Sequence, residues 1–154
     1  MLKDNSLMLQ NQPIKIFLAD RYPHFRDNIK SVFRKKEIEV SGEADTAEDL
    51  IQQLKSNKPD LLITAHRLLD ESADSFLPLI KEKYPDIKIL LLTLNCHKKV
   101  FLKYIDYLDG MLCKMARKEE LLEAITDIAK KDKLYFRVNK YAEEVRDQRQ
   151  NKLR

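Results

Sequence analysis

The feature that most constrains the fold of this chain is a set of three short apolar runs. They read IKIFLA at residues 14–19, DLLITA at residues 60–65 and IKILLLT at residues 87–93. Most of their residues are apolar in direct succession instead of alternating with polar ones, which is typical of parallel strands covered on both faces. The runs therefore predict a buried parallel sheet.

The segments around these runs have helical periodicity. Within residues 25–33 the apolar side chains recur at i, i+4, i+7 and i+8, which gives a helix one buried face. Similar apolar spacing recurs within residues 50–54, 76–80 and 121–128. Strands that alternate with helices indicate right-handed β-α-β units. We therefore expect an α/β domain whose parallel sheet has helices on both faces.

Four side chains fall at the predicted ends of strands. They are Asp20, Ala65, Thr93 and Lys114. Sheets of this kind place their working residues at the carboxyl ends of the strands, where the strand order reverses. We expect these four residues to lie close together.

Composition excludes several classes of protein. The chain has 154 residues, of which 35% are charged and 44% are apolar, as in an ordinary soluble domain. It contains no apolar stretch of membrane-spanning length and no signal-peptide pattern, so we expect a cytoplasmic protein that does not bind membranes. The two cysteines, Cys96 and Cys113, lack the partners of a zinc site.

The net charge of +4 is unevenly distributed. Residues 131–154 hold eight basic and four acidic residues, whereas residues 1–130 hold 21 of each sign. A basic tail attracts nucleic acid, but acidic residues interrupt this one, as in a solvated helix face. We expect no direct DNA binding by the tail.

Five segments, taken in order, resemble the strand ends of a response-regulator receiver domain, most closely those of NarL/LuxR-type transcription regulators. They read IKIFLADRYP at 14–23, SGEADTAEDL at 41–50, PDLLITAH at 59–66, YPDIKILLLT at 84–93 and DGMLCK at 109–114. The resemblance covers about residues 13–131. It implies a flavodoxin-like (CheY-like) three-layer sandwich with a five-stranded parallel sheet, followed by a C-terminal linker helix.

The chain departs from this family at the residues that accept phosphate. The resemblance implies a phosphorylatable aspartate where this sequence has Ala65, and a pair of acids where it has Asp20 and Arg21. The aromatic switch position of the family is occupied by Met111. Thr93 and Lys114 match the switch hydroxyl and the phosphate-pairing lysine of the family.

These departures remove chemistry that phosphoryl transfer requires. Transfer to a carboxylate needs a nucleophilic aspartate and a Mg²⁺ ion held by neighbouring acids. Asp20 alone, beside the permanently charged Arg21, gives Mg²⁺ little reason to shed its water. We therefore expect no catalytic residue, no cofactor and weak or absent Mg²⁺ binding.

Two interpretations of the remaining site stay open. Either Lys114 or Arg21 neutralises Asp20 in a structural ion pair, or Arg21, Thr93 and Lys114 bind an anion. Asp70, Glu71 and His66 are weaker candidates for a substitute phosphate acceptor. Acids at the first two positions are explained more simply by solvent exposure or by a helix N-terminus.

The resemblance implies a pseudo-receiver that acts through protein contacts. Pairing through the first and last helices gives a candidate dimer surface of Phe25, Ile29, Leu121 and Ile125, although each of these side chains also suits the core. The partner is expected to be a second copy or another regulatory protein.

We expect three parts in the chain: a flexible segment at 1–12, a receiver-like domain at 13–131 and a basic linker with a helix at 132–154. In the NarL/LuxR family such a linker leads to a helix-turn-helix DNA-binding domain, which this sequence lacks. We therefore expect the regulatory part of a transcription regulator. The alternative is a stand-alone interaction module, or a sensor of anions or small ligands.

Overall fold

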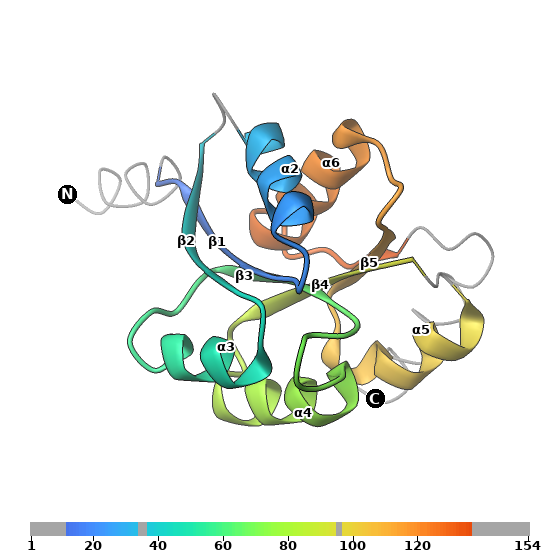
Figure 1. Cartoon of the computed structure of the whole chain (residues 1–154). Coiled ribbons are helices and arrows are strands. Elements are labelled where there is room, and N and C mark those ends of the chain that lie inside the picture. Colours follow the sequence, from blue (N-terminus) through green and yellow to red (C-terminus); the bar gives the residue numbers. More distant parts are fainter. Residues whose placement is uncertain (1–11, 34–36, 95–96, 137–154) are drawn as a thin grey trace.

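The strands of this protein form one parallel sheet with helices on both faces (Figure 1). The computed structural model describes residues 12–33, 37–94 and 97–136. The strand order is β2-β1-β3-β4-β5-β6, and every neighbouring pair is parallel. The strands are β1 (Ile14–Ala19), β2 (Ile38–Ala44), β3 (Leu61–Ala65), β4 (Lys88–Thr93), β5 (Gly110–Cys113) and β6 (Tyr135–Phe136).

Helices of the described residues cover both faces of the sheet (Figure 1). On the first face lie α2 (Pro23–Phe33) and α6 (Lys118–Ala129). On the second lie α3 (Ala47–Leu54), α4 (Ala73–Lys83) and α5 (Lys98–Tyr104), with α5 continuing into the short 3-10 helix η1 (Ile105–Tyr107). The predicted fold class is confirmed. Sequence periodicity had not singled out α5.

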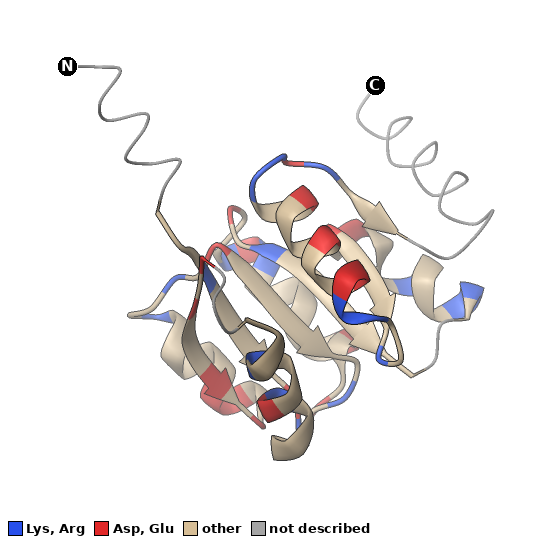
Figure 2. Cartoon of the chain, turned by 90° about the horizontal axis from the view of Figure 1, so that it is seen from above, with Lys and Arg blue, Asp and Glu red and all other residues tan. Residues whose placement is uncertain are grey.

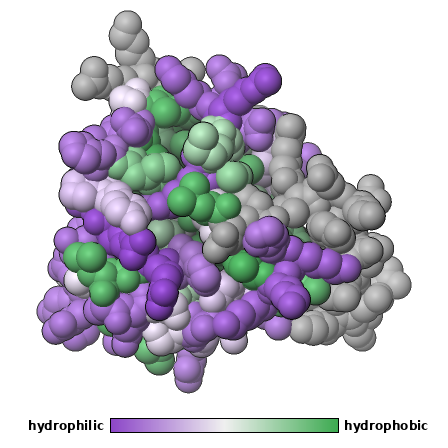
Figure 3. Space-filling model, turned by 45° about the vertical axis from the view of Figure 1, so that its right-hand side comes forward, coloured by the Kyte–Doolittle hydropathy of each residue, from purple (hydrophilic) through white to green (hydrophobic). Residues whose placement is uncertain are grey.

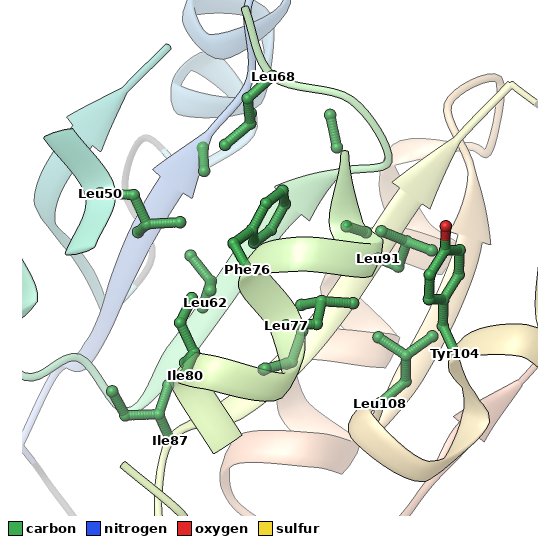
Figure 4. Close-up of a cluster of buried hydrophobic side chains, with 14 of the residues drawn as sticks. Leu50, Leu62, Leu68, Phe76, Leu77, Ile80, Ile87, Leu91, Tyr104 and Leu108 are labelled. Atoms are coloured by element: carbon green, nitrogen blue, oxygen red, sulfur yellow. The ribbon is translucent and has the colours of Figure 1, made fainter. Parts of the chain in front are cut away.

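The apolar runs form strands because both of their faces become buried. In β3, Leu62 points toward the α3–α4 side, whereas Leu61 and Ile63 belong to the core under α2 and α6. Figure 4 shows Leu62 beside Phe76 of α4. Successive side chains of a strand point to opposite faces, so a strand covered on both faces has no solvent-facing position. This explains the absence of apolar–polar alternation in the runs.

Within the described residues the sheet has six strands, where five were predicted. The sixth strand, β6, lies beyond residue 131, the expected end of the domain, and it pairs with β5. Tyr135 and Phe136 are buried, and the Phe136 ring packs edge-on against Phe101 with 5.0 Å between centroids. A two-residue strand has no detectable periodicity in the sequence. It forms because its side chains are buried against the sheet. Of the linker and helix expected at 132–154, residues 137–154 lie outside the described residues, as does nearly all of the N-terminal segment expected at 1–12.

Charged residues of both signs are interspersed over the described part of the chain (Figure 2). This agrees with the charge balance of residues 1–130 in the sequence. None of the described helices combines the length and the apolar character needed to span a bilayer.

Candidate functional site

The ends of β1, β3, β4 and β5 meet at one edge of the sheet and surround a shallow pocket of about 150 Å³. Arg21, Ala65, Thr93 and Lys114 all line it. The sheet order explains this, because these four strands are consecutive neighbours in the order β1-β3-β4-β5. Of the four residues that were expected to lie close together, Ala65, Thr93 and Lys114 line the pocket. Asp20 lies just beyond the pocket lining and contacts it through Lys114.

Asp20 is a buried carboxylate that is already engaged. Its side chain is 5% exposed, and Lys114 Nζ lies 2.7 Å from its Oδ2 atom. The backbone N–H of Tyr22 donates a hydrogen bond of 2.8 Å to Oδ1. A buried charge needs such partners, since desolvation alone would disfavour it. Of the two cations considered for this ion pair, the structure assigns Lys114.

Lys114 is held in place from several sides. Its Nζ atom lies 4.3 Å from the ring centroid of Phe25 and 5.3 Å from that of Tyr22, both in α2 or just before it. Its backbone N–H donates to the carbonyl of Thr93 at 3.0 Å, which ties the end of β5 to the end of β4. Aromatic faces stabilise a cation at such distances. The lysine therefore links three strand ends around the pocket.

Arg21 contacts Tyr22. Its guanidinium donates a hydrogen bond of 2.5 Å to Tyr22 Oη and lies 4.7 Å from the Tyr22 ring centroid. The residue is exposed, and within the described residues it forms no ion pair. It therefore brings an uncompensated positive charge to the rim of the pocket.

The other predicted positions are buried. Ala65, the last residue of β3, is 4% exposed and places only a methyl group at the pocket. Thr93 is also buried, at the end of β4. Met111 is fully buried in β5 and belongs to the core on the α3, α4 and α5 side, away from the pocket lining.

Sequence reasoning missed a polar network beside the pocket. His66 Nε2 lies 2.9 Å from Tyr104 Oη, and Lys103 Nζ lies 2.8 Å from Asp74 Oδ2. Hydrogen bonds from Lys103 and from Tyr104 lower the pKa of Asp74. The network joins His66, the residue after β3, to α4 and to α5, which lies about 30 residues further along the chain.

The ionisation of this network follows from burial. Desolvation lowers the pKa of His66 below its ordinary value of 6.5, so the imidazole is neutral at neutral pH. Burial, then the hydrogen bond to Asp74, raises the pKa of Tyr104. His66 therefore adds a neutral ring, and not a charge, to the wall of the pocket.

Asp70 caps a helix. Its Oδ1 atom accepts a hydrogen bond of 2.7 Å from the N–H of Ala47, and its Oδ2 atom accepts one of 3.1 Å from the N–H of Glu48. Partial desolvation opposes ionisation, but these backbone hydrogen bonds together lower the pKa of Asp70. The carboxylate thus satisfies the exposed N–H groups at the start of α3. This agrees with the simpler interpretation of an acid at a helix N-terminus.

Most of the candidate dimer surface lies in the core of the monomer. Ile29, Leu121 and Ile125 are 5%, 8% and 0% exposed, and they pack between the sheet and helices α2 and α6. Phe25 is half-buried, and it lines a groove of about 170 Å³ between α2 and α6 together with Ile29 and Leu121.

The residues at the strand ends do not fit a Mg²⁺ ion. Magnesium requires several oxygen ligands in a near-octahedral arrangement. Asp20 is paired with Lys114, and the next residue is a cation. Across the described residues, no group of three or more His, Cys, Asp and Glu side chains is placed to hold a metal.

The sequence of this chain matches the model of a known protein family. The model of the response regulator receiver domain matches residues 16–126, which is most of the chain. The chain belongs to the response regulator receiver domain family. The pocket at the strand ends is thus part of a receiver domain.

The relatives of this chain include a transcriptional regulatory protein. The chain is 28% identical over 129 residues to an uncharacterized transcriptional regulatory protein, YxjL, of Bacillus subtilis, covering 82% of this chain and 59% of YxjL. It spans between 16% and 59% of the length of the curated relatives that it matches.

Solved receiver structures share the fold. The isolated receiver domain of RcsB from Salmonella enterica serovar Typhimurium, solved with phosphomimetic BeF3-, has a TM-score of 0.75 at 19% identity, covering 87% of this chain and 99% of that one. A structure of two RcsB dimers bound to two parallel DNAs has a TM-score of 0.77 at 19% identity, covering 87% of this chain and 68% of that one.

Proposed function

We propose that this receiver domain is a pseudo-receiver that regulates without accepting a phosphoryl group. The observation that carries the proposal is Ala65, a buried methyl group at the end of β3 in the wall of the pocket. A methyl group cannot act as the nucleophile in phosphoryl transfer. Asp20, the acid at the end of β1, is already paired with Lys114 and hydrogen bonded to Tyr22.

We also propose that the domain is not an enzyme and uses no cofactor. Among the described residues that line the pocket there is no carboxylate, and the one imidazole, His66, is hydrogen bonded to Tyr104. Activation of a nucleophile requires an adjacent base that a third group orients. The pocket therefore lacks the arrangement that catalysis of this kind requires.

The domain is proposed to act through protein contacts, including a homodimer. The groove between α2 and α6 supports this, because the half-buried Phe25 remains accessible there. The similar RcsB structure contains dimers bound to DNA. By analogy, this chain would be the regulatory part of a NarL/LuxR-type regulator in the cytoplasm, and DNA would be bound only by a helix-turn-helix domain outside this sequence.

Incubation with acetyl phosphate and Mg²⁺, followed by intact mass spectrometry, tests the pseudo-receiver proposal. The expected result is no phosphoryl mass, because Ala65 offers no acceptor oxygen. Beryllofluoride should likewise leave the amide NMR positions of the strand ends unmoved. A stoichiometric gain of phosphoryl mass would overturn the proposal.

A sensor of small anions is the second candidate function. Its support is that Arg21, Thr93 and Lys114 line one pocket, as such a sensor requires. Isothermal titration with sulfate and with nucleotide phosphates tests it. The absence of heat at millimolar ligand would remove this candidate.

A further inference from the structure

The pocket at the strand ends has a positive charge that nothing in the described part of the chain neutralises. Arg21, Arg67 and Lys114 line it. The charge of Lys114 is balanced by Asp20, but Arg21 and Arg67 are both exposed and form no ion pair within the described residues. Two guanidinium groups without an ion pair among the described residues, at one pocket, favour an anionic ligand, and their planar donors suit a carboxylate.

Beside these charges, the rim of the same pocket also carries exposed apolar side chains. Tyr22 is 48% exposed and Leu94 is 67% exposed, and both line the pocket. Met115, next to Lys114 at the end of β5, is 81% exposed. These side chains come from three strand ends that the sheet brings to one edge. Figure 3 shows apolar side chains among hydrophilic ones on one face of the molecule.

This combination distinguishes a peptide from a free ion. Phosphate or sulfate gains nothing from exposed leucine, methionine and tyrosine side chains, whereas apolar residues of a peptide would bury them. The pocket of about 150 Å³ has room for one acidic side chain, because Ala65 contributes only a methyl group to its lining. The ligand that fits both features is an acidic side chain with apolar neighbours.

We infer that this pocket receives an aspartate or glutamate of a partner protein, flanked by apolar residues that cover Tyr22, Leu94 and Met115. The partner would thus place a carboxylate in the pocket where this chain has only the methyl group of Ala65. The inference rests on the proposed function, since it names the chemistry of the partner that a pseudo-receiver would bind.

The test is selection of a phage-displayed library of random short peptides on the whole chain. The expected binders carry Asp or Glu next to Leu, Ile, Met or an aromatic residue. Binding of the best peptide, measured by fluorescence anisotropy, should weaken by about tenfold or more in Arg21→Glu/Arg67→Glu, because both attractive charges become repulsive. Peptide addition should shift the amide signals of Ala65 and Leu94.

The matched control is Lys55→Glu/Lys58→Glu, which changes the net charge equally at exposed residues near the opposite edge of the sheet. Its affinity should stay within about twofold of the original. Leu94→Ser/Met115→Ser alters only exposed side chains and should also weaken binding. This second pair tests the apolar rim even if the charge reversal impairs folding.

Three outcomes would overturn the inference. They are binders without acidic residues, a peptide that binds equally well after its acidic residue becomes alanine, and inorganic phosphate that shifts the same amides at the same concentration as the peptide. The acetyl phosphate assay on the same sample separates the two proposals. A phosphoryl mass gain contradicts the proposed function, whereas peptide failure without phosphorylation contradicts only the carboxylate site.

Discussion

At the scale of single residues, Lys114 balances the buried charge at the strand ends. Its side chain and that of Asp20 are 11% and 5% exposed, and no other cation pairs with this carboxylate among the described residues. Removal of one partner of a buried ion pair leaves an uncompensated charge in a medium that solvates it poorly.

Lys114→Met should therefore lower the free energy of unfolding by about 3 kcal/mol in urea denaturation. Lys103→Met is the control, since its pair with Asp74 is exposed and should be worth less than about 1 kcal/mol. Adding Asp20→Asn to Lys114→Met should recover part of the loss. Equal stability of the two lysine variants would mean that the Asp20 pair is not structural.

Arg21 and Ala65 lead to a second prediction at the residue scale. Ala65→Asp alone should not restore efficient phosphorylation, because the positive charge of Arg21, the residue after Asp20, still repels Mg²⁺. Ala65→Asp with Arg21→Asp should accept more phosphoryl groups from acetyl phosphate, measured by intact mass. If the single variant is phosphorylated as fully as the double one, Arg21 does not obstruct the metal.

At the scale of elements, Asp70 connects the loop after β3 to the start of α3. Asp70→Ala should destabilise the protein by about 1 kcal/mol at neutral pH, as loss of a helix cap does, and should speed amide exchange at Ala47 and Glu48. Glu71→Ala is the control, because Glu71 is exposed and adjacent in sequence but its side chain makes no such bond.

The same variant has a defined pH dependence. The pKa of Asp70 is lowered in the folded protein from its ordinary value of 3.8, so the folded state favours the charged form. The stabilisation is therefore complete above that ordinary value and is lost as the pH falls through the lower folded pKa. The stability difference between the original chain and Asp70→Ala should shrink over that acidic range, and a constant difference would contradict the cap.

The last strand, β6, gives another prediction for an element. Phe136 is 4% exposed and packs on Phe101, and Tyr135 donates its N–H to the Asp109 carbonyl at 2.9 Å. Phe136→Ala should cost about 3 kcal/mol in the free energy of unfolding. Leu79→Ala, at a side chain that is 54% exposed, should change it by less than about 0.5 kcal/mol. Equal effects would mean that β6 does not contribute to the core.

At the scale of the whole molecule, the proposed function predicts the size of the native protein. The chain has a mass of 18.2 kDa and spans 59% of the length of YxjL. An immunoblot of the source cells, with an antibody raised against this chain, should show a band above 18.2 kDa by about one small DNA-binding domain. A band at 18.2 kDa would instead favour the stand-alone interaction module.

The layered architecture could be predicted because hydrophobic patterning is local. The runs at 14–19, 60–65 and 87–93 became β1, β3 and β4, and the periodic segments became α2, α3, α4 and α6. The site could be located in outline, since parallel strands place their ends at one edge. Strand β6 and helix α5 escaped prediction because they are short, and their apolar residues matter only through contacts with distant segments.

The sequence by itself determined the chemistry that is present at the strand ends: an alanine, an arginine, a threonine and a lysine, with one acid. Only the tertiary structure decided which of these charges are neutralised by a partner. Lys114 pairs with Asp20, Arg21 turns to Tyr22, and Arg67 joins the pocket from the loop after β3. The physical reason is that burial and distance set which charges are neutralised, and both arise only when segments far apart in the chain are packed together.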